Sequence, residues 1–304
     1  MNSSVIYSDF TSNSNNRAAE FLRIIFEILT VMFFLLFLYF LSLMLHVFFT
    51  TAHVRDNARY ILFIHMLIND TLYLAAGLTL FMLSMFLVYI PVPVCYVIVT
   101  LASVTFRITP YNLLAMAVER YVAICFPLRH VTLCTSQRTN YIITSIWVIG
   151  LIPNIADFIV LRSSVENSFF SQKVICLQAT VTLKSVQISI SSNILIISLI
   201  LVGLIIVFTY IRVMLIARRM NSGSSASKAG KTIMLHAFHF LLCIVSLLSP
   251  ITDSYLRRYS NVLPIVDFLF LSCLPRCLSP LIYGIRDNVF RKRIKQFCLT
   301  NLKD

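Results

Sequence analysis

Residues 25–49 read IFEILTVMFFLLFLYFLSLMLHVFF, and Glu27 is the one carboxylate in the whole run. A helix needs about 20 mostly apolar residues to cross the roughly 30 Å hydrocarbon core of a bilayer. This stretch therefore predicts a membrane-spanning helix, and comparable stretches recur along the chain. We predict seven spans, centred on residues 25–49, 58–86, 93–125, 139–161, 189–217, 231–252 and 261–284.

The composition of the whole chain agrees with a lipid-embedded protein. Of the 304 residues, 59% are hydrophobic and only 12% are charged, with a mean hydropathy of +0.86. A soluble domain is about one quarter charged, and it could not hide so much apolar surface from water. We therefore expect an all-α membrane protein, a seven-transmembrane helix bundle. Its expected parts are an amino-terminal segment (1–22), the membrane domain (23–285) and a carboxyl-terminal tail (286–304).

The basic residues predict the orientation. Of the 25 lysines and arginines, 16 fall on one side of the predicted spans, 7 on the other, and Arg107 and Arg276 lie within spans. Because cytoplasmic loops carry the basic excess, the amino terminus is expected outside and the carboxyl terminus inside. The net charge of +13 then indicates topology and contact with anionic membrane lipids, and no nucleic-acid partner is expected.

Cysteine positions fit this topology. Cys95 opens the third span on the outside, and Cys176 lies in the long outer connection at about 162–188. The other six cysteines fall on the reducing side or within spans. Since disulfides persist in oxidising compartments, a Cys95–Cys176 bond is the one disulfide expected.

The inner end of the third span carries the most specific motif. Met116 to His130 read MAVERYVAICFPLRH, which strongly resembles the MA-x-[DE]-RYVAIC-x-PLRY signature of odorant receptors, a branch of the rhodopsin-like G protein-coupled receptors. SPLIYGIRD (Ser279–Asp287), KAGKTIMLHAFHF (Lys228–Phe240), LIND ending at Asp70, and Trp147 are similar to further family positions. Glu119 in place of aspartate, and GIRD after the tyrosine, resemble fish-type members.

The resemblance implies a function and a set of switch residues. A small-molecule odorant would activate a heterotrimeric G protein of the stimulatory olfactory type, at the plasma membrane. Arg120 would pair locally at rest and bind the G protein on activation, although an interfacial arginine can also simply extend to water. The implied coupling and switch residues are Glu119, Arg120, Tyr121, Tyr210, His236, Pro280 and Tyr283.

Charges inside the spans need partners, because each costs about 2.5–3.5 kcal/mol on insertion scales. In the family, the position of Asp70 faces the part of the seventh span that holds Arg276. Two interpretations stay open: a buried Asp70–Arg276 ion pair, or a sodium ion held by Asp70.

The resemblance also implies a ligand cavity among spans three, five, six and seven. Arg107 lies near its expected floor, where it would bind an acidic ligand or instead brace the bundle against Asp157. The expected ligand-binding residues are Ala102, Ser103, Phe106, Arg107, Ser198, Leu247, Ile251, Leu269 and Cys273.

Further motifs concern modification and metal binding. Asn2-Ser3-Ser4 is a glycosylation sequon, and residues 286–298 read as a short amphipathic helix after the seventh span, with Cys298 a candidate for palmitoylation. His236, His239 and Cys243 share a helix face, but packing is favoured there over a metal site. We expect no cofactor and no enzymatic activity.

Two other functions compete with that of an odorant receptor. A non-olfactory rhodopsin-like receptor for another small ligand is the nearer alternative, although an amine ligand would need a carboxylate near Ala102. A transporter or channel would need polar stripes and broken helices, and the chain has only six glycines.

Overall fold

Long apolar helices account for most of the chain in the computed structural model, which describes residues 3–177, 180, 185–219, 238, 241–242, 245 and 266–278. Five helices each contain a stretch long and apolar enough to cross a membrane. These are α1 (Ser3–Thr50), α3 (Ala58–Met85), α4 (Val92–Cys125), α6 (Ser136–Ser164) and α8 (Ser185–Arg219). The short elements are α2 (Ala52–Arg55), α5 (Pro127–Leu133), β1 (Tyr89–Pro91), β2 (Lys173–Ile175), the 3-10 helix η1 (Asn167–Ser171) and the π-helix η2 (Phe268–Cys273).

The first five predicted spans coincide with these long helices. α1 begins at Ser3, inside the segment assigned to the amino terminus, but the stretch that can cross a membrane begins at Glu20. Most of the predicted sixth span lies outside the described residues. Of the seventh, residues 266–278 are described, and Phe268–Leu278 is a shorter apolar helix.

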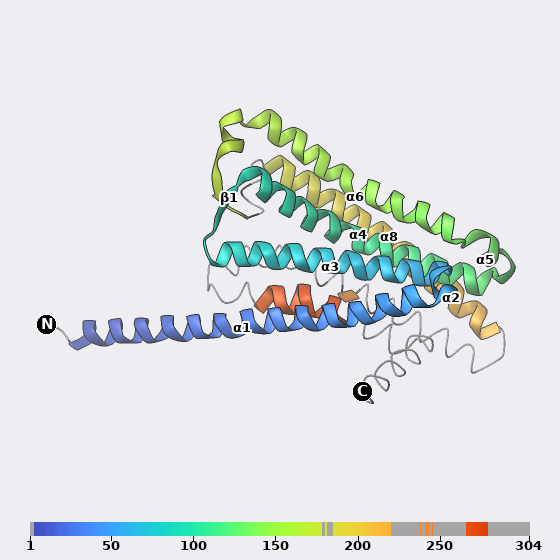
Figure 1. Cartoon of the computed structure of the whole chain (residues 1–304), viewed down its shortest axis with the longest axis horizontal. Helices are drawn as coiled ribbons and strands as arrows, with labels where there is room; N and C mark the ends of the chain where they lie inside the picture. Colours follow the sequence, from blue (N-terminus) through green and yellow to red (C-terminus); the bar gives the residue numbers. More distant parts are fainter. Residues whose placement is uncertain are drawn as a thin grey trace. The chain divides into compact units, whose positions relative to one another are not determined.

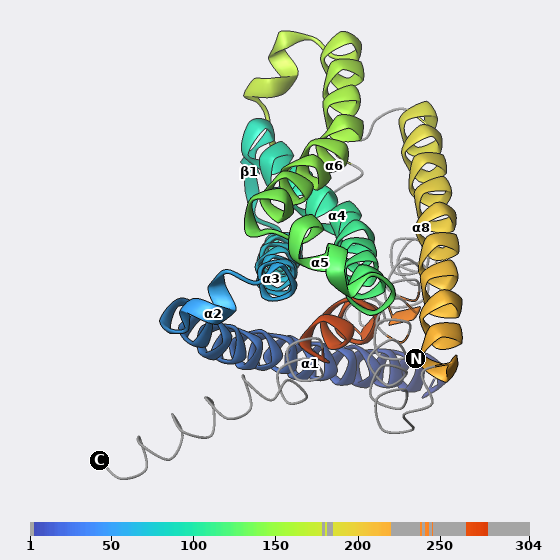
Figure 2. The same ribbon diagram turned by 90° about the vertical axis from the view of Figure 1, so that its right-hand side faces the viewer.

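The chain divides into two compact units, each described by itself. Unit 2 comprises Met44–Phe240, and its long helices α3, α4, α6 and α8 run side by side (Figure 1). Seen after a 90° turn, α4 lies between the other three (Figure 2), and it contacts each of them. Unit 1 comprises Met1–Leu43 and Leu241–Asp304. Within it, Cys277 Sγ lies 3.8 Å from the Phe33 carbonyl oxygen.

Small and polar residues hold the helices of unit 2 together, as is common where lipid removes the hydrophobic drive for association. Gly150 of α6 meets Ile108 of α4 so closely that a Cβ at this position would lie 2.8 Å from Ile108 Cγ1. Asn69 Nδ2 of α3 donates to the Thr105 carbonyl (3.0 Å) and to Thr109 Oγ1 (3.1 Å) on α4. Close backbone approach and buried hydrogen bonds therefore bind α4 to α6 and to α3.

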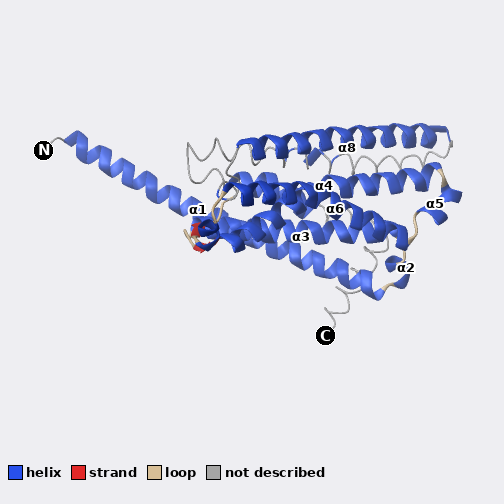
Figure 3. Ribbon diagram, turned by 90° about the horizontal axis from the view of Figure 1, so that it is seen from above, coloured by secondary structure: helices blue, strands red, loops and turns tan. Residues whose placement is uncertain are grey.

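One end of unit 2, here the strand end, carries a small sheet. β1 pairs antiparallel with β2, joining Tyr89 to Ile175 and Pro91 to Lys173. A disulfide joins Cys95 to Cys176, the predicted pairing, with Cα atoms 5.3 Å apart. Figure 3 shows the strands at this end and α5 at the opposite end, here the α5 end.

α3 has distinct signals at its two ends. The side chain of Asn57 accepts a hydrogen bond from the Arg59 amide (3.1 Å), a helix amino-terminal cap. At the carboxyl-terminal end, the Val88 amide donates to the Leu83 carbonyl (3.0 Å), and Leu87 has a φ of 50°. This left-handed position usually belongs to glycine, and another residue there costs roughly 1–2 kcal/mol.

Candidate functional site

A cluster of charged side chains occupies the α5 end of α4. Glu119 is buried, and its Oε2 lies 3.6 Å from Nε of the neighbouring Arg120. Its Oε1 lies 3.0 Å from Nε2 of His130 on α5. An ionised Glu119 accepts this hydrogen bond, with Nε2 of His130 as the donor. One carboxylate therefore contacts both the motif arginine and the connection between α4 and α6.

His130 was missed as a functional residue in the sequence, although a signal was present. The odorant-receptor signature ends in tyrosine, and MAVERYVAICFPLRH ends in histidine. α5 places the imidazole: the His130 amide donates to the Phe126 carbonyl (2.9 Å), and the Cys134 amide donates to the His130 carbonyl (2.9 Å). The short helix α5 thus brings the side chain of His130, 11 residues further along the chain, into contact with Glu119.

Cys134 follows α5 and lies outside the membrane-spanning segments. Partial burial raises the pKa of its thiol, and the negative charge of Glu119 raises this pKa further. The thiol therefore stays protonated at neutral pH. Glu119 thus lies close enough to act electrostatically on Cys134, in addition to its contacts with Arg120 and His130.

Two predicted switch tyrosines lie in the described residues. The ring of Tyr121 contacts Phe126 edge-on, with centroids 5.8 Å apart, and lies 6.3 Å from Phe208 of α8. Tyr210 lies half-buried on α8. Aromatic contacts thus connect the motif on α4 to α8.

A polar face joins α4 to α6, nearer the strand end. The Ser103 hydroxyl donates to Asn154 Oδ1, and Tyr96 Oη donates to the Asn154 carbonyl oxygen (3.1 Å). Arg107, one turn beyond Ser103, interacts electrostatically with Asp157 of α6. The brace between Arg107 and Asp157 stays a prediction, and Asn154 is an additional polar residue that the sequence did not single out.

The other described ligand residues of the prediction belong to both units. Phe106 stacks on Tyr73 of α3, with ring centroids 5.7 Å apart. Ala102 and Ser198 are half-buried on α4 and α8. Leu269 and Cys273 are buried in unit 1, within the π-helix η2, a geometry frequent at functional sites.

The two residues of the predicted buried pair belong to different units. Asp70 is fully buried in unit 2, beside Asn69. Arg276 is buried in unit 1, where its Nη1 donates to the Ser272 carbonyl (3.1 Å). Their pairing, and the sodium alternative, stay predictions.

Several predicted site residues lie outside the described residues, and so does the His236–His239–Cys243 metal set. The site residues concerned are Asn2, His236, Leu247, Ile251, Pro280, Tyr283 and Cys298. In the part of the chain that the structure describes, no three metal-ligating side chains gather to hold a metal ion.

Comparison with known proteins decides the family. Residues 41–283 match the family of seven-transmembrane receptors of the rhodopsin type. The chain belongs to this family. Receptors of this kind are not enzymes, so the absence of a catalytic motif in the sequence agrees with the match. Membership also argues against the transporter or channel alternative.

The relatives of the receptor point to its odorant branch. It is 31% identical to Odorant receptor 131-2 of Danio rerio over 271 residues, which cover 86% of this chain and 82% of the relative. Two Homo sapiens proteins match over shorter regions. Olfactory receptor 52R1 is 29% identical over 202 residues, 62% of each chain, and Olfactory receptor 5AK2 is 26% identical over 214 residues, 66% of each chain.

Proposed function

We propose that the receptor binds a small-molecule odorant and activates a heterotrimeric G protein of the stimulatory olfactory type. The observation that carries this proposal is the Glu119–Arg120 contact, inside MAVERYVAICFPLRH, in a chain of the rhodopsin family. A nitrogen–oxygen distance of 3.6 Å suits a contact that can open. Ligand binding would then shift a pre-existing equilibrium towards a state in which Arg120 meets the G protein.

The proposed architecture has seven spans, with the sixth and seventh at 231–252 and 261–284. The basic residues favour an extracellular amino terminus (1–22), with Asn2 glycosylated. They also favour a cytoplasmic location for the α5 end and for the tail (286–304). The tail would form the amphipathic helix on the inner leaflet, with Cys298 palmitoylated.

The proposed ligand cavity lies among spans three, five, six and seven, with Arg107 near its floor. A carboxylate at Asp157 would compensate part of the positive charge of this guanidinium, which would stay protonated. A guanidinium carries five N–H donors, more than one carboxylate accepts. We therefore favour a small, mostly apolar ligand with a hydrogen-bond-accepting group over an amine.

Arg120→Ala tests the coupling. An agonist is first found by screening acids, alcohols and amines against cells carrying a cyclic-AMP reporter. Arg120→Ala should keep surface expression and agonist affinity within about threefold but abolish the cyclic-AMP response. Arg129→Ala, which removes an exposed arginine of α5, is the matched control and should respond normally. Normal signalling by Arg120→Ala removes the proposed mechanism.

Arg107→Met tests the ligand class on the same panel. Methionine keeps much of the apolar stem and removes every N–H donor. Selective loss of acceptor-bearing agonists supports a ligand contact, whereas equal loss across the panel makes Arg107 a scaffold residue. Activation of the wild-type receptor mainly by amines contradicts the proposed class.

A further inference from the structure

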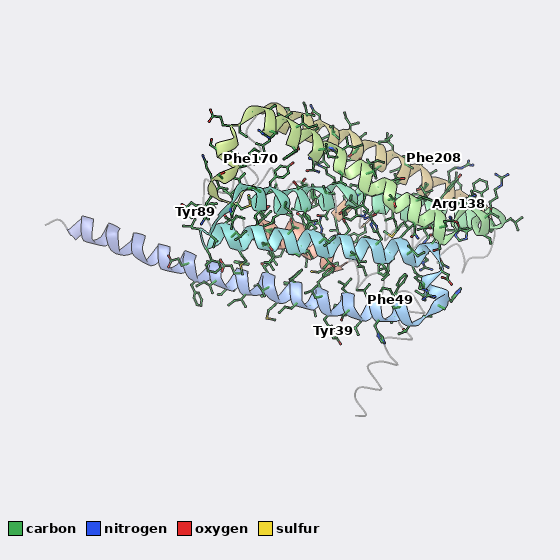
Figure 4. All side chains as sticks on the ribbon, turned by 45° about the horizontal axis from the view of Figure 1, so that its top comes forward. Tyr39, Phe49, Tyr89, Arg138, Phe170 and Phe208 are labelled. Atoms are coloured by element: carbon green, nitrogen blue, oxygen red, sulfur yellow. A yellow bond between two sulfur atoms is a disulfide. The ribbon has the colours of Figure 1, made fainter. Side chains whose placement is uncertain are left out.

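Four consecutive apolar residues, Phe86–Tyr89, follow the end of α3 and are here called the aromatic turn. Phe86, Leu87, Val88 and Tyr89 are 64%, 63%, 40% and 62% exposed. Figure 4 labels Tyr89 at the strand end of unit 2, away from Arg138 at the α5 end. Unlike the exposed apolar residues within the spans, these four lie beyond the membrane-crossing stretch of their helix, which ends at Ser84. Their exposure therefore needs its own explanation.

The length of α3 places this turn at the depth of the lipid headgroups. The helix has 28 residues, which at 1.5 Å per residue make about 42 Å. The hydrocarbon core measures about 30 Å, and the bilayer with its headgroup regions about 40–45 Å. A helix of this length, centred in the bilayer and parallel to its normal, would reach past the hydrocarbon and end within the interfacial layer. Tyrosine and other amphipathic aromatic rings are enriched at this depth.

The backbone gives an independent argument. Leu87 holds a left-handed conformation, with a φ of 50°, that glycine or asparagine would adopt at lower cost. The bond from the Val88 amide to the Leu83 carbonyl closes the turn around it. Leu87 is 63% exposed, so burial within the protein offsets little of the strain. Burial of the Leu87 side chain in lipid would offset the strain.

We propose that the aromatic turn Phe86–Tyr89 inserts into the headgroup boundary of the adjacent leaflet and anchors the α3–α4 connection to the membrane. The partner is the lipid surface itself. The turn is continuous with a helix that crosses the same bilayer, and it contains no charged residue. The same connection supplies β1 and leads into Cys95, so an anchor here would hold the sheet and the disulfide at a fixed depth. The inference depends on neither the proposed ligand nor the G protein.

The single tryptophan of the chain makes a direct test possible. Trp147→Phe combined with Phe86→Trp places one fluorophore in the turn, here the turn fluorophore. The matched control combines Trp147→Phe with Ser168→Trp, an exposed position of η1 at the same end. Each full-length protein is reconstituted in phosphatidylcholine vesicles whose acyl chains are brominated at shallow or deep positions. Aqueous iodide provides the opposite quencher.

We expect shallow bromines to quench the turn fluorophore at least twofold more than deep bromines, with little effect of iodide. The Ser168→Trp control should be quenched strongly by aqueous iodide and only weakly by the brominated lipids. Quenching by iodide as strong as in the control places the turn in water and overturns the proposal. Protection from both quenchers, together with energy transfer between fluorophores on neighbouring receptor molecules, would show that the turn contacts protein. This result also overturns the proposal. If Trp147→Phe does not fold, Phe86→Trp is measured with Trp147 present, and the signal of the unsubstituted protein is subtracted.

Leu87→Asn provides a second readout. Asparagine accepts the left-handed backbone but removes the apolar side chain, whereas Leu87→Gly relieves the strain without adding a polar group. An anchored turn predicts that Leu87→Asn reduces shallow-bromine quenching of the turn fluorophore by about half, and that Leu87→Gly reduces it less. Equal quenching in Leu87→Asn and in the parent contradicts a role for this side chain in the membrane.

Discussion

The two ends of α4 are held in place by different chemistry. At the strand end, Cys95 is bonded covalently to Cys176, and both residues are fully buried. At the α5 end, Glu119 contacts Arg120 at 3.6 Å and His130 at 3.0 Å. The first connection cannot open without a reductant, whereas the second consists of hydrogen bonds and charge contacts.

This difference assigns different tasks to the two ends. Hydrogen bonds to charged groups contribute about 1.5–3 kcal/mol each, a range that ligand binding can overcome. The covalent end can therefore serve as a fixed frame, while the charged end can take two states. A helix that is fixed at one end and can be released at the other can transmit a conformational change, caused by ligand binding, to the opposite side of a membrane.

Removing the covalent connection should produce the largest effect. Cys176→Ser opens a loop closed over a sequence separation of 81 residues, which the chain-entropy model values at about 4.5 kcal/mol. We expect strong loss of surface expression, measured by flow cytometry on an epitope-tagged receptor. Cys134→Ser removes a free cysteine at the other end and should be expressed normally. Equal expression of both variants would falsify the role given to the disulfide.

Weakening the charged end should change the activity more than the expression. Glu119→Gln keeps the shape of the side chain and removes the charge that Arg120 meets. A loss of about 1–1.4 kcal/mol from the resting state raises a small active population roughly 5- to 10-fold. Basal cyclic AMP per surface receptor should rise accordingly. An unchanged basal level at normal expression contradicts a resting lock at Glu119.

His130 should contribute less than the charge of Glu119. His130→Ala removes the 3.0 Å contact. Because the side chain of His130 is 26% exposed, solvent weakens this contact to about 1 kcal/mol, below the range for fully buried charged groups, and the thermal midpoint should fall by about 2 °C. His130→Gln retains an N–H donor and should recover most of this loss. Equal losses in the two variants would mean that packing of the ring, and not the bond to Glu119, matters. Scanning fluorimetry of the purified receptor measures the shifts.

The membrane helices could be predicted closely because lipid imposes their length and polarity. The expected spans 58–86 and 93–125 agree with α3 (Ala58–Met85) and α4 (Val92–Cys125) within one residue at each end. The strands β1 and β2 were not predicted. Each has only three residues, too few for an alternating pattern, and their pairing joins residues about 80 positions apart.

The directions in which side chains point were harder to predict than the positions of the helices. The polar residues of α4 are spread around its circumference and do not gather on one face, so its sequence alone does not fix the rotation of the helix. The contacts of Ser103 with Asn154 and of Phe106 with Tyr73 therefore became evident only in the structure. Motif residues such as Glu119 and Arg120 could be assigned because a specific pattern, not helix rotation, identified them.

The smallest expected effect concerns the thiol of Cys134, which reports the electrostatic field at the α5 end. Burial and the Glu119 charge both raise its pKa, so at neutral pH the reactive thiolate is scarce. Alkylation by iodoacetamide should therefore be slow at pH 7 and should accelerate as the pH rises towards the raised pKa. Peptide-level mass spectrometry of the reconstituted receptor measures the rate at this one cysteine.

Glu119→Gln should accelerate alkylation of Cys134 at pH 7, because removing the negative charge lowers the thiol pKa while its partial burial persists. Glu166→Gln is the matched control, since this exposed carboxylate lies beside η1 at the strand end, and it should leave the rate unchanged. Equal acceleration in both variants would indicate a general effect of net charge. If Glu119→Gln causes no acceleration, the charge of Glu119 acts only on Arg120 and His130. The electrostatic effect of this carboxylate would then not extend to Cys134.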